Sequence, residues 1–200
     1  DIELWASGCH TNDLEETNVS YRNGVIDCAA HISNFGPQTT KRLKAIEYPV
    51  NLLSLLFYLW RVRPDILHVQ WLPLLEAFPL PEQLFLRVCQ QWDIPVVYTV
   101  HDILPLDAEA GHRRTYRQIY QMVDALICHT KTTREQLIED FNVDPSVVYV
   151  IPHGPLLGGT TDLSKNKARQ RLDLPSSATI ALQFGVLRPY KGTDILLRAW

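Results

Sequence analysis

Several motifs that mark common enzyme classes are absent from this 200-residue sequence. It contains no GxSxG, the nucleophile turn of an α/β-hydrolase. It contains neither GxxxxGK[ST] nor GxGxxG, so it shows no ATP-type phosphate loop and no dinucleotide fingerprint. There is no DxD pair, and the histidines have neither HxxxH nor HExxH spacing. We therefore expect no metal site.

The sequence also has little excess charge and few cysteines. Nineteen Lys and Arg residues against 22 Asp and Glu give a net charge of −3, so no electrostatic argument favours nucleic acid as a partner. The four cysteines lie far apart without a CxxC pair, which favours reduced thiols in a cytoplasmic protein over a disulfide framework. They are Cys9, Cys28, Cys89 and Cys128.

No apolar run reaches the roughly 20 residues that a membrane span requires. The longest candidate is Val50–Trp60, preceded by Pro49 and followed by Arg61 and Arg63. Proline suits the first position of a helix, and arginine suits its C-terminal end. One interpretation is a buried helix over Pro49–Arg61. The other is a helix whose aromatic and basic end, within residues 49–63, rests on a membrane surface.

Strand-like apolar runs alternate with helical patterns along the rest of the chain. The expected strands are Ile2–Ala6, Ile66–Gln70, Val96–Val100, Ala125–Cys128, Val147–Ile151 and Thr179–Phe184. The expected helices are Pro49–Arg61, Pro81–Trp92, Arg113–Val123 and Thr133–Phe141, the last capped by Thr132 or Thr133. This alternation predicts an α/β fold, a doubly wound parallel sheet with helices on both sides. Residues 8–23 and 33–41 are expected to be loops.

A segment rich in Gly, Pro, Ser and Thr, Ile151–Lys167, predicts a boundary between residues 1–155 and 156–200. His153 and Gly154 are the expected hinge. A short helix near Ser164–Leu172 should follow. Because the chain starts at Asp1 without Met and ends inside a helical pattern, we expect it to be a fragment.

Polar residues follow several expected strands, where open parallel sheets bind their ligands. Gln70, His101 with Asp102, and His129 with Thr130 each stand at such an end. The imidazole of His101 suits a hydrogen bond to a substrate hydroxyl, or proton transfer. A structural histidine bonded to Asp102 or to the backbone is the alternative. For His129 the alternative is a His-Thr pair that caps the next helix. His68 is expected to be a core residue.

The turn "GVLRPYKG", from Gly185 to Gly192, carries Arg188 and Lys191 between two glycines. Backbone N–H groups of a helix starting near Thr193, a guanidinium fork and a mobile ammonium would together suit a phosphate or diphosphate. A solvated basic turn is the alternative.

Four stretches in order carry a resemblance: "RPDILHVQW", "IPVVYTVHD", "VDALICHTKTTREQLIEDFNVDPSVVYVIPHG" and "FGVLRPYKGTDILLRAW". They resemble the retaining glycosyltransferases of family four, two-domain GT-B enzymes that use nucleotide-sugar donors. The resemblance implies a Rossmann-like, acceptor-side domain over 1–155 without its first strand. The start of the nucleotide-sugar-binding domain follows over 156–200. It implies hexose transfer with retention, needing no metal or other cofactor, to a glycan or lipid-linked acceptor.

The resemblance also assigns roles to residues. Arg188 and Lys191 would hold the donor diphosphate with Gly185 and Gly192, and His101 would face the donor sugar as the catalytic residue. The commonest family form has arginine where this chain has Val186. Candidate substrate-binding residues are Asp102, His129, Gln70 and Trp71.

Two family elements are not in this sequence. The family's first strand with its glycine-rich loop would precede Asp1, and its E-x7-E segment would follow Trp200, so we expect a gap in the sheet and no activity from these residues alone. Two alternatives remain: a GT-B nucleotide-sugar epimerase and a non-catalytic GT-B partner subunit. The expected location is cytoplasmic, with peripheral association at the inner membrane surface through residues 49–63.

Overall fold

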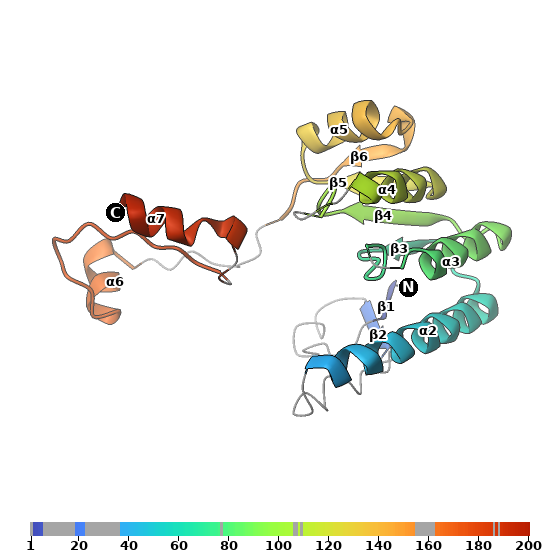
Figure 1. Cartoon of the computed structure of the whole chain (residues 1–200), viewed down its shortest axis with the longest axis horizontal. Coiled ribbons are helices and arrows are strands. Elements are labelled where there is room, and N and C mark those ends of the chain that lie inside the picture. Colours follow the sequence, from blue (N-terminus) through green and yellow to red (C-terminus); the bar gives the residue numbers. More distant parts are fainter. Residues whose placement is uncertain are drawn as a thin grey trace. The chain divides into compact units, whose positions relative to one another are not determined.

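The computed structural model describes residues 2–5, 19–22, 37–76, 78–105, 108, 110–154, 163–185, 187 and 189–200. The chain divides into two compact units, Asp1–Pro152 and His153–Trp200 (Figure 1). The division lies inside the Gly- and Pro-rich segment that predicted a boundary, three positions before the expected residue 155. Each unit is described by itself.

The strands of the first unit form two parallel sheets. β1 (Ile2–Trp5) pairs with β2 (Val19–Arg22). The second sheet has the order β3-β4-β5-β6, with every neighbouring pair parallel. Its strands are β3 (Leu67–Val69), β4 (Val96–Val100), β5 (Ala125–Cys128) and β6 (Val148–Val150). Among the described residues no strand pairs β1 with β3, and the expected gap in the sheet stays a prediction.

Helices connect these strands and pack in one layer. They are α2 (Pro37–Val62), α3 (Leu80–Gln91), α4 (Ala110–Met122) and α5 (Lys131–Phe141). Each helix contacts the next one in this order, and Figure 1 shows α3 and α4 beside the strands that they connect. Parallel strands in consecutive order with right-handed crossovers place their connecting helices on the same face of the sheet. The described residues therefore form one of the two helix layers that a doubly wound sheet has.

The core lies between this helix layer and the sheet. Val96 and Leu126 from the strands, and Ile119 and Leu137 from the helices, have no exposed surface. Alternate residues of a strand point to opposite faces, so Val96, Tyr98 and Val100 of β4 face the helices together with Leu126 and Cys128 of β5. The thiols of Cys89 and Cys128 are buried and free, and burial raises their pKa, to about 11 for Cys89.

Several boundaries differ from the sequence-based expectations; α4, for example, begins at Ala110 instead of Arg113. α2 begins at Pro37 instead of Pro49, and Pro49 lies inside the helix, so residues 37–41 are not loop. The leucines that pack toward the core, such as Leu55 and Leu59, lie beyond the proline and hold the helix there. Residues 19–22 form β2 where a loop was expected, because a partner strand supplies hydrogen bonds that their own composition does not signal. Finally, α5 is capped by Thr130, whose hydroxyl accepts from the N–H of Thr133.

The second unit contains α6 (Lys165–Arg171), a 3-10 turn (Pro189–Lys191) and α7 (Thr193–Ala199). Ser164, expected within the helix near Ser164–Leu172, instead caps α6: its hydroxyl accepts from the N–H of Lys167 (3.4 Å). The expected strand Thr179–Phe184 is wrong: these residues form no strand, because a strand needs a neighbour and the described part of this unit holds none. Phe184 is consequently 93% exposed.

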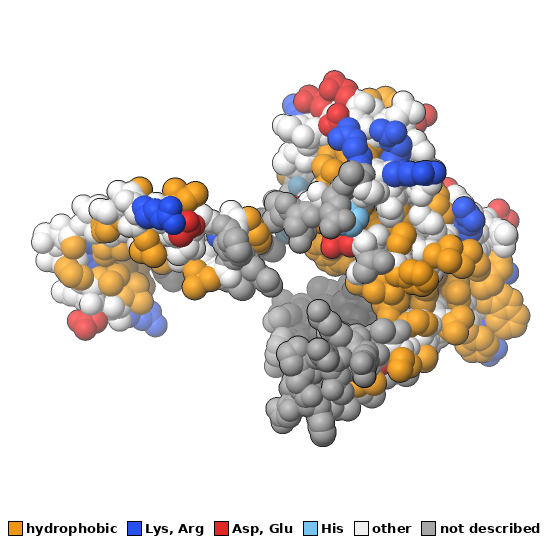
Figure 2. Space-filling view, in the orientation of Figure 1, with side chains coloured by type: hydrophobic (Ala, Val, Ile, Leu, Met, Phe, Trp, Pro, Cys, Tyr) orange, Lys and Arg blue, Asp and Glu red, His pale blue; other side chains and the backbone are white. Residues whose placement is uncertain are grey.

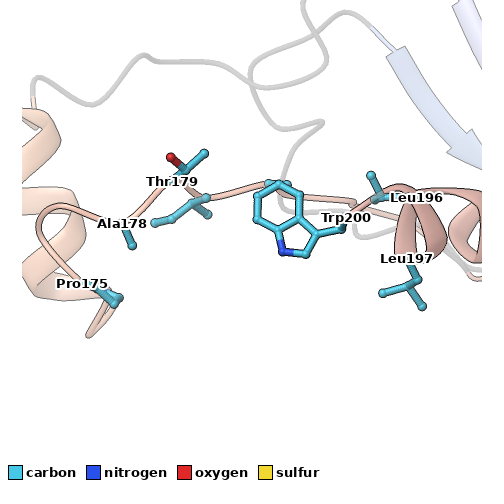
Figure 3. A pocket seen from close by; sticks show the side chains of 8 residues that line it. Pro175, Ala178, Thr179, Leu196, Leu197 and Trp200 are labelled. Atoms are coloured by element: carbon cyan, nitrogen blue, oxygen red, sulfur yellow. The ribbon is translucent and has the colours of Figure 1, made fainter.

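An open apolar hollow of about 420 Å³ lies in this second unit (Figure 3). Pro175, Ala178 and Thr179 line one part of it, and Leu196, Leu197 and Trp200 of the C-terminal helix region line another. No described residue of the unit is buried. The hollow is therefore exposed hydrophobic surface without a core beneath it. Among the described residues of the chain, no helix combines the length and the hydropathy of a membrane-spanning segment.

Candidate active site

The carboxyl ends of β3, β4 and β5 bring the predicted site residues of the first unit together. Gln70 and Trp71 follow β3, His101 and Asp102 follow β4, and His129 follows β5. The register aligns Val69 with Tyr98 and Val100 with Cys128, so these chain segments leave the sheet side by side. Ligands of open parallel sheets bind at this edge.

His101 is held from two directions. Its ring stacks on the indole of Trp71, with 4.5 Å between the ring centroids and 11° between the planes. Its Nε2 lies 2.9 Å from Oε1 of Gln70. The ring of His129 is also near, at 5.4 Å and tilted by 48°. Three of the predicted residues thus surround the imidazole, which favours a defined ring orientation.

Hydrogen bonds continue from Gln70 into the sheet. Nε2 of Gln70 lies 3.2 Å from Nε2 of His68, which lies 2.8 Å from Oγ1 of Thr99. His68 was expected to be a core residue, but it is the most exposed residue of β3. The alternation of strand side chains places His68, Gln70 and Thr99 on the sheet face opposite the helix layer. His68 is thereby part of the site.

His129 and Thr130 have separate roles. Nδ1 of His129 donates to the carbonyl oxygen of Ile151 over 2.9 Å, which anchors its ring to the segment after β6. Thr130 caps α5, so the threonine of the His-Thr pair has the capping role that was the alternative to substrate binding. The histidine remains beside His101.

A cavity of about 110 Å³ opens beside His101. Its lining includes Trp71, Glu76, Tyr98, Asp102 and Tyr116. Water takes about 30 Å³ per molecule in the liquid, so this volume suits a few water molecules or sugar hydroxyls. Burial raises the pKa of Tyr98 to about 12, so its hydroxyl stays protonated at neutral pH.

A buried carboxyl fixes the loop that carries Trp71. Glu82 of α3 has no exposed surface, and its Oε1 accepts from the hydroxyl of Tyr48 (2.6 Å) and from the N–H of Leu74 (2.9 Å). Burial raises the pKa of Glu82, although both hydrogen bonds lower it. Sequence reasoning missed this residue. Its spacing with the buried Phe85, Leu86 and Cys89 places it on the apolar stripe of α3, and an acidic residue on such a stripe was the available signal.

The predicted diphosphate turn lies in the second unit. Gly185 and Gly192 have φ values of 122° and 64°, so both need the left-handed backbone that glycine adopts readily. Nε2 of Gln183 donates to Oγ1 of Thr193 (2.8 Å), which ties the start of this turn to its end. Nζ of Lys191 lies 5.2 Å from the ring centroid of Tyr190. Arg188 lies outside the described residues, and its role stays a prediction.

The predicted hinge residues stand at the start of the second unit. Nδ1 of His153 lies 3.4 Å from the carbonyl oxygen of Gly154. A Cβ on Gly154 would meet no atom within 4 Å. Packing does not require glycine at position 154, and the hinge stays a prediction.

The sequence is similar to known glycosyltransferases. The sequence profile described as Glycosyltransferase Family 4 matches residues 5–155. Similar curated proteins include the D-inositol 3-phosphate glycosyltransferases of Streptosporangium roseum and Kineococcus radiotolerans, which are 34% and 31% identical over 120 residues. Those matches cover 55% and 54% of this chain and 28% of each relative's length.

A solved structure has a similar fold. A glycosyltransferase from Rickettsia africae aligns with a TM-score of 0.56 and 14% identity, over 98% of this chain and 48% of that chain. At this identity the likeness concerns the fold alone. It agrees with the parallel sheet described above and confirms the predicted α/β, GT-B-type fold. The profile match confirms the family to which the sequence motifs pointed: the chain belongs to Glycosyltransferase Family 4.

Proposed function

We propose that the protein containing this chain transfers a hexose from a nucleotide-diphosphate sugar to an acceptor hydroxyl, with retention at the anomeric carbon. The observation that carries this proposal is the imidazole of His101. It is held by Trp71 and Gln70 at the carboxyl edge of the sheet, beside a cavity suited to hydroxyl groups. Family membership supports the reaction class.

The proposal assigns one role to residues of the first unit and another to residues of the second. The bond between the anomeric carbon and the diphosphate breaks, the acceptor oxygen forms the new bond, and the acceptor proton is released. His101 would contact the sugar, where a neutral imidazole can accept or donate a hydrogen bond. The departing diphosphate gains negative charge, which Lys191 and Arg188 would stabilise as preorganised cations. With these cations the reaction would need no metal.

The relatives direct the search for the acceptor. Their names specify D-inositol 3-phosphate, so a phosphorylated polyol is the first acceptor to test, beside glycans and lipid-linked sugars. The full-length protein would be incubated with GDP-, UDP- and ADP-hexoses and these acceptors. Formation of a glycosidic product with the donor's anomeric configuration, unaffected by EDTA, would support the proposal.

Two other outcomes would contradict it. A donor sugar that changes its configuration when no acceptor is present would identify an epimerase, because only that enzyme returns the sugar to the same diphosphate. Failure of the folded full-length protein to bind or to turn over any nucleotide sugar would identify a non-catalytic partner subunit.

A lipid-linked acceptor is favoured by one face of α2. Ile46, Val50, Leu53, Phe57 and Trp60 follow one another at intervals of four and three residues, and each is between 45% and 66% exposed. Figure 2 shows hydrophobic side chains gathered over the right-hand ends of α2 and α3. An apolar helix face that lies in a membrane interface has this form.

The charges of α2 favour an anionic surface. The helix sequence contains Lys41, Arg42, Lys44 and Arg61, and its one acidic residue, Glu47, is buried. Arg61 directly follows the exposed Trp60, and a basic residue next to interfacial apolar side chains attracts anionic lipid headgroups. The proposal therefore includes peripheral binding to the cytoplasmic surface of a membrane.

Flotation with vesicles tests this part of the proposal. The full-length protein should float with vesicles that contain anionic lipid, and less with neutral phosphatidylcholine vesicles. Leu53→Ser with Phe57→Ser should abolish flotation. Leu172→Ser is the matched control, because Leu172 is as exposed as Leu53, at 66%, but lies after α6. No flotation of the unaltered protein, or equal flotation of both variants, would overturn the membrane assignment.

A further inference from the structure

The side-chain amide of Gln70 bridges two histidines. Its oxygen Oε1 lies 2.9 Å from Nε2 of His101, and its nitrogen lies 3.2 Å from Nε2 of His68. An amide oxygen can only accept a hydrogen bond, and an amide nitrogen can only donate one. The orientation of one amide therefore fixes which nitrogen of each imidazole carries a proton.

The protons of both rings follow from this geometry. His101 must donate from Nε2, because Oε1 of Gln70 only accepts. His68 must accept at Nε2, so this imidazole is neutral and carries its proton on Nδ1. The hydroxyl of Thr99, 2.8 Å from the same Nε2 of His68, then donates to it. Thr99 is only 3% exposed, so its hydroxyl is shielded from water, and His68 is its side-chain partner.

We propose that His68 is a positioning residue: through the amide of Gln70 it fixes the tautomer of His101 with the proton on Nε2. Nδ1 is then the acceptor of the His101 ring. Stacking on Trp71 fixes the plane of the His101 ring. The hydrogen bond to Gln70 fixes the direction in which Nε2 points within that plane. The consequence for catalysis rests on the proposed function, whereas the proton positions do not.

Two further observations agree with a neutral His68. Desolvation lowers the pKa of its imidazole, so the ring is neutral at neutral pH although the side chain keeps exposed surface. His68 lies within β3, which pairs with β4 along all three of its residues, so the backbone that carries it is held in register. The donor group that it orients, the amide of Gln70, stands one residue beyond the strand.

The reversed amide is the competing arrangement. With Gln70 turned by 180°, His68 would donate from Nε2 and His101 would accept at Nε2, carrying its proton on Nδ1. The two arrangements place opposite protons on both rings. A measurement of imidazole protonation therefore separates them without any assay of activity.

The test is nitrogen-15 NMR of the histidine side chains in the full-length protein at pH 7.5. In the unaltered protein His101 should show a protonated Nε2 and an unprotonated Nδ1. His68→Val removes the acceptor for Gln70, so His101 should become a mixture of both tautomers. His68→Asn keeps a carbonyl acceptor and should restore the single tautomer. His112, whose Nε2 donates to the carbonyl of Glu76 (3.2 Å), should stay unchanged throughout.

A second variant keeps the proposal testable if His68→Val fails to fold. In the Gln70→Glu variant the carboxylate can only accept hydrogen bonds, so the proton of His68 should move to Nε2 while His101 keeps its Nε2 proton.

In transferase assays His68→Val should lower kcat about tenfold with little change of KM for the donor, because the orientation of His101 is lost and donor binding is not. A proton on Nδ1 of His101 in the unaltered protein, or no tautomer change in His68→Val, would overturn the assignment. If the full-length protein shows no transferase activity, the NMR measurement of the His101 tautomer still tests the role of His68.

Discussion

The indole of Trp71 lies nearly parallel to the imidazole of His101, with 4.5 Å between their centroids. The two residues follow neighbouring parallel strands, β3 and β4, and meet where both strands end. Trp71 itself is 63% exposed, so it contributes little to the core. Its contact with His101 is consequently a feature of the site more than of the fold.

Trp71→Ala should therefore reduce activity more than stability. An aromatic pair contributes about 0.5–1.5 kcal/mol beyond the area that it buries, so the free energy of unfolding should fall by about that amount plus the contribution of the surface that Trp71 buries. Turnover by the full-length enzyme should fall roughly tenfold, because the imidazole gains rotational freedom. Thermal melts and steady-state kinetics measure both, and Tyr149→Ala on β6, which removes an aromatic side chain that is 54% exposed and outside the site, is the control. A large loss of stability with unchanged turnover of the remaining folded enzyme would contradict a role in the site.

His101→Ala should separate chemistry from donor binding. A group that takes part in proton transfer or in polarising the sugar typically accounts for roughly 10²-fold or more of the rate. Turnover should fall by that factor, whereas the affinity for the nucleoside diphosphate, measured by calorimetry, should change little. Unfolding of the variant, seen by circular dichroism, would instead support the alternative of a structural histidine.

Lys191→Ala and Arg188→Ala should each weaken the use of the donor. Loss of a cation that stabilises a transition-state charge costs roughly 10²-fold in rate. The measurement is kcat/KM for the nucleotide sugar in the full-length enzyme. Lys165→Ala at the start of α6 removes the same charge outside the turn and should have no effect. Equal effects of Lys165→Ala and Lys191→Ala would indicate a solvated basic turn.

Glu82→Gln should remove a pH dependence of stability. Below about pH 4.5, the usual pKa of this carboxyl, folded and unfolded chains both carry the proton. Above it the unfolded chain releases the proton, while burial keeps Glu82 protonated in the folded chain. Stability therefore falls as the pH rises toward the raised pKa, by at most about 1.4 kcal/mol per pH unit.

The comparison requires urea unfolding from pH 4 to pH 8. The free energy of unfolding of the unaltered protein should fall relative to that of Glu82→Gln as the pH rises across this range. Glu139→Gln is the control, because Glu139 is an exposed residue of α5 and its exchange should leave the pH profile unchanged. Parallel profiles for the unaltered protein and Glu82→Gln would show that Glu82 is ionised in the folded chain.

Local patterns predicted the central elements of the first unit closely. The strand expected at Val96–Val100 is β4, and the helix expected at Thr133–Phe141 is α5 with two further residues at its start. These segments carry strong periodicity and clear end signals, which depend only on neighbouring residues. Pro49 misled the prediction of α2, because the packing of leucines beyond it outweighs its missing N–H.

Segments that depend on distant partners were predicted less well. β2 exists because β1 pairs with it, and Thr179–Phe184 forms no strand because its described surroundings offer no partner. The same reason applies to the site. Gln70, Trp71, His101 and His129 could be chosen from their positions at strand ends, but their mutual contacts could not.

The alternation of β3 to β6 with α3, α4 and α5, and the family, were determined by the sequence itself, because periodicity and motifs are local properties. Only the tertiary structure decided that His68 joins the site, that Trp71 stacks on His101 and that Glu82 is buried and bonded to Tyr48. These relationships join residues up to 34 positions apart, such as Tyr48 and Glu82. Strand register and helix packing set such distances, and neither is encoded by any single segment.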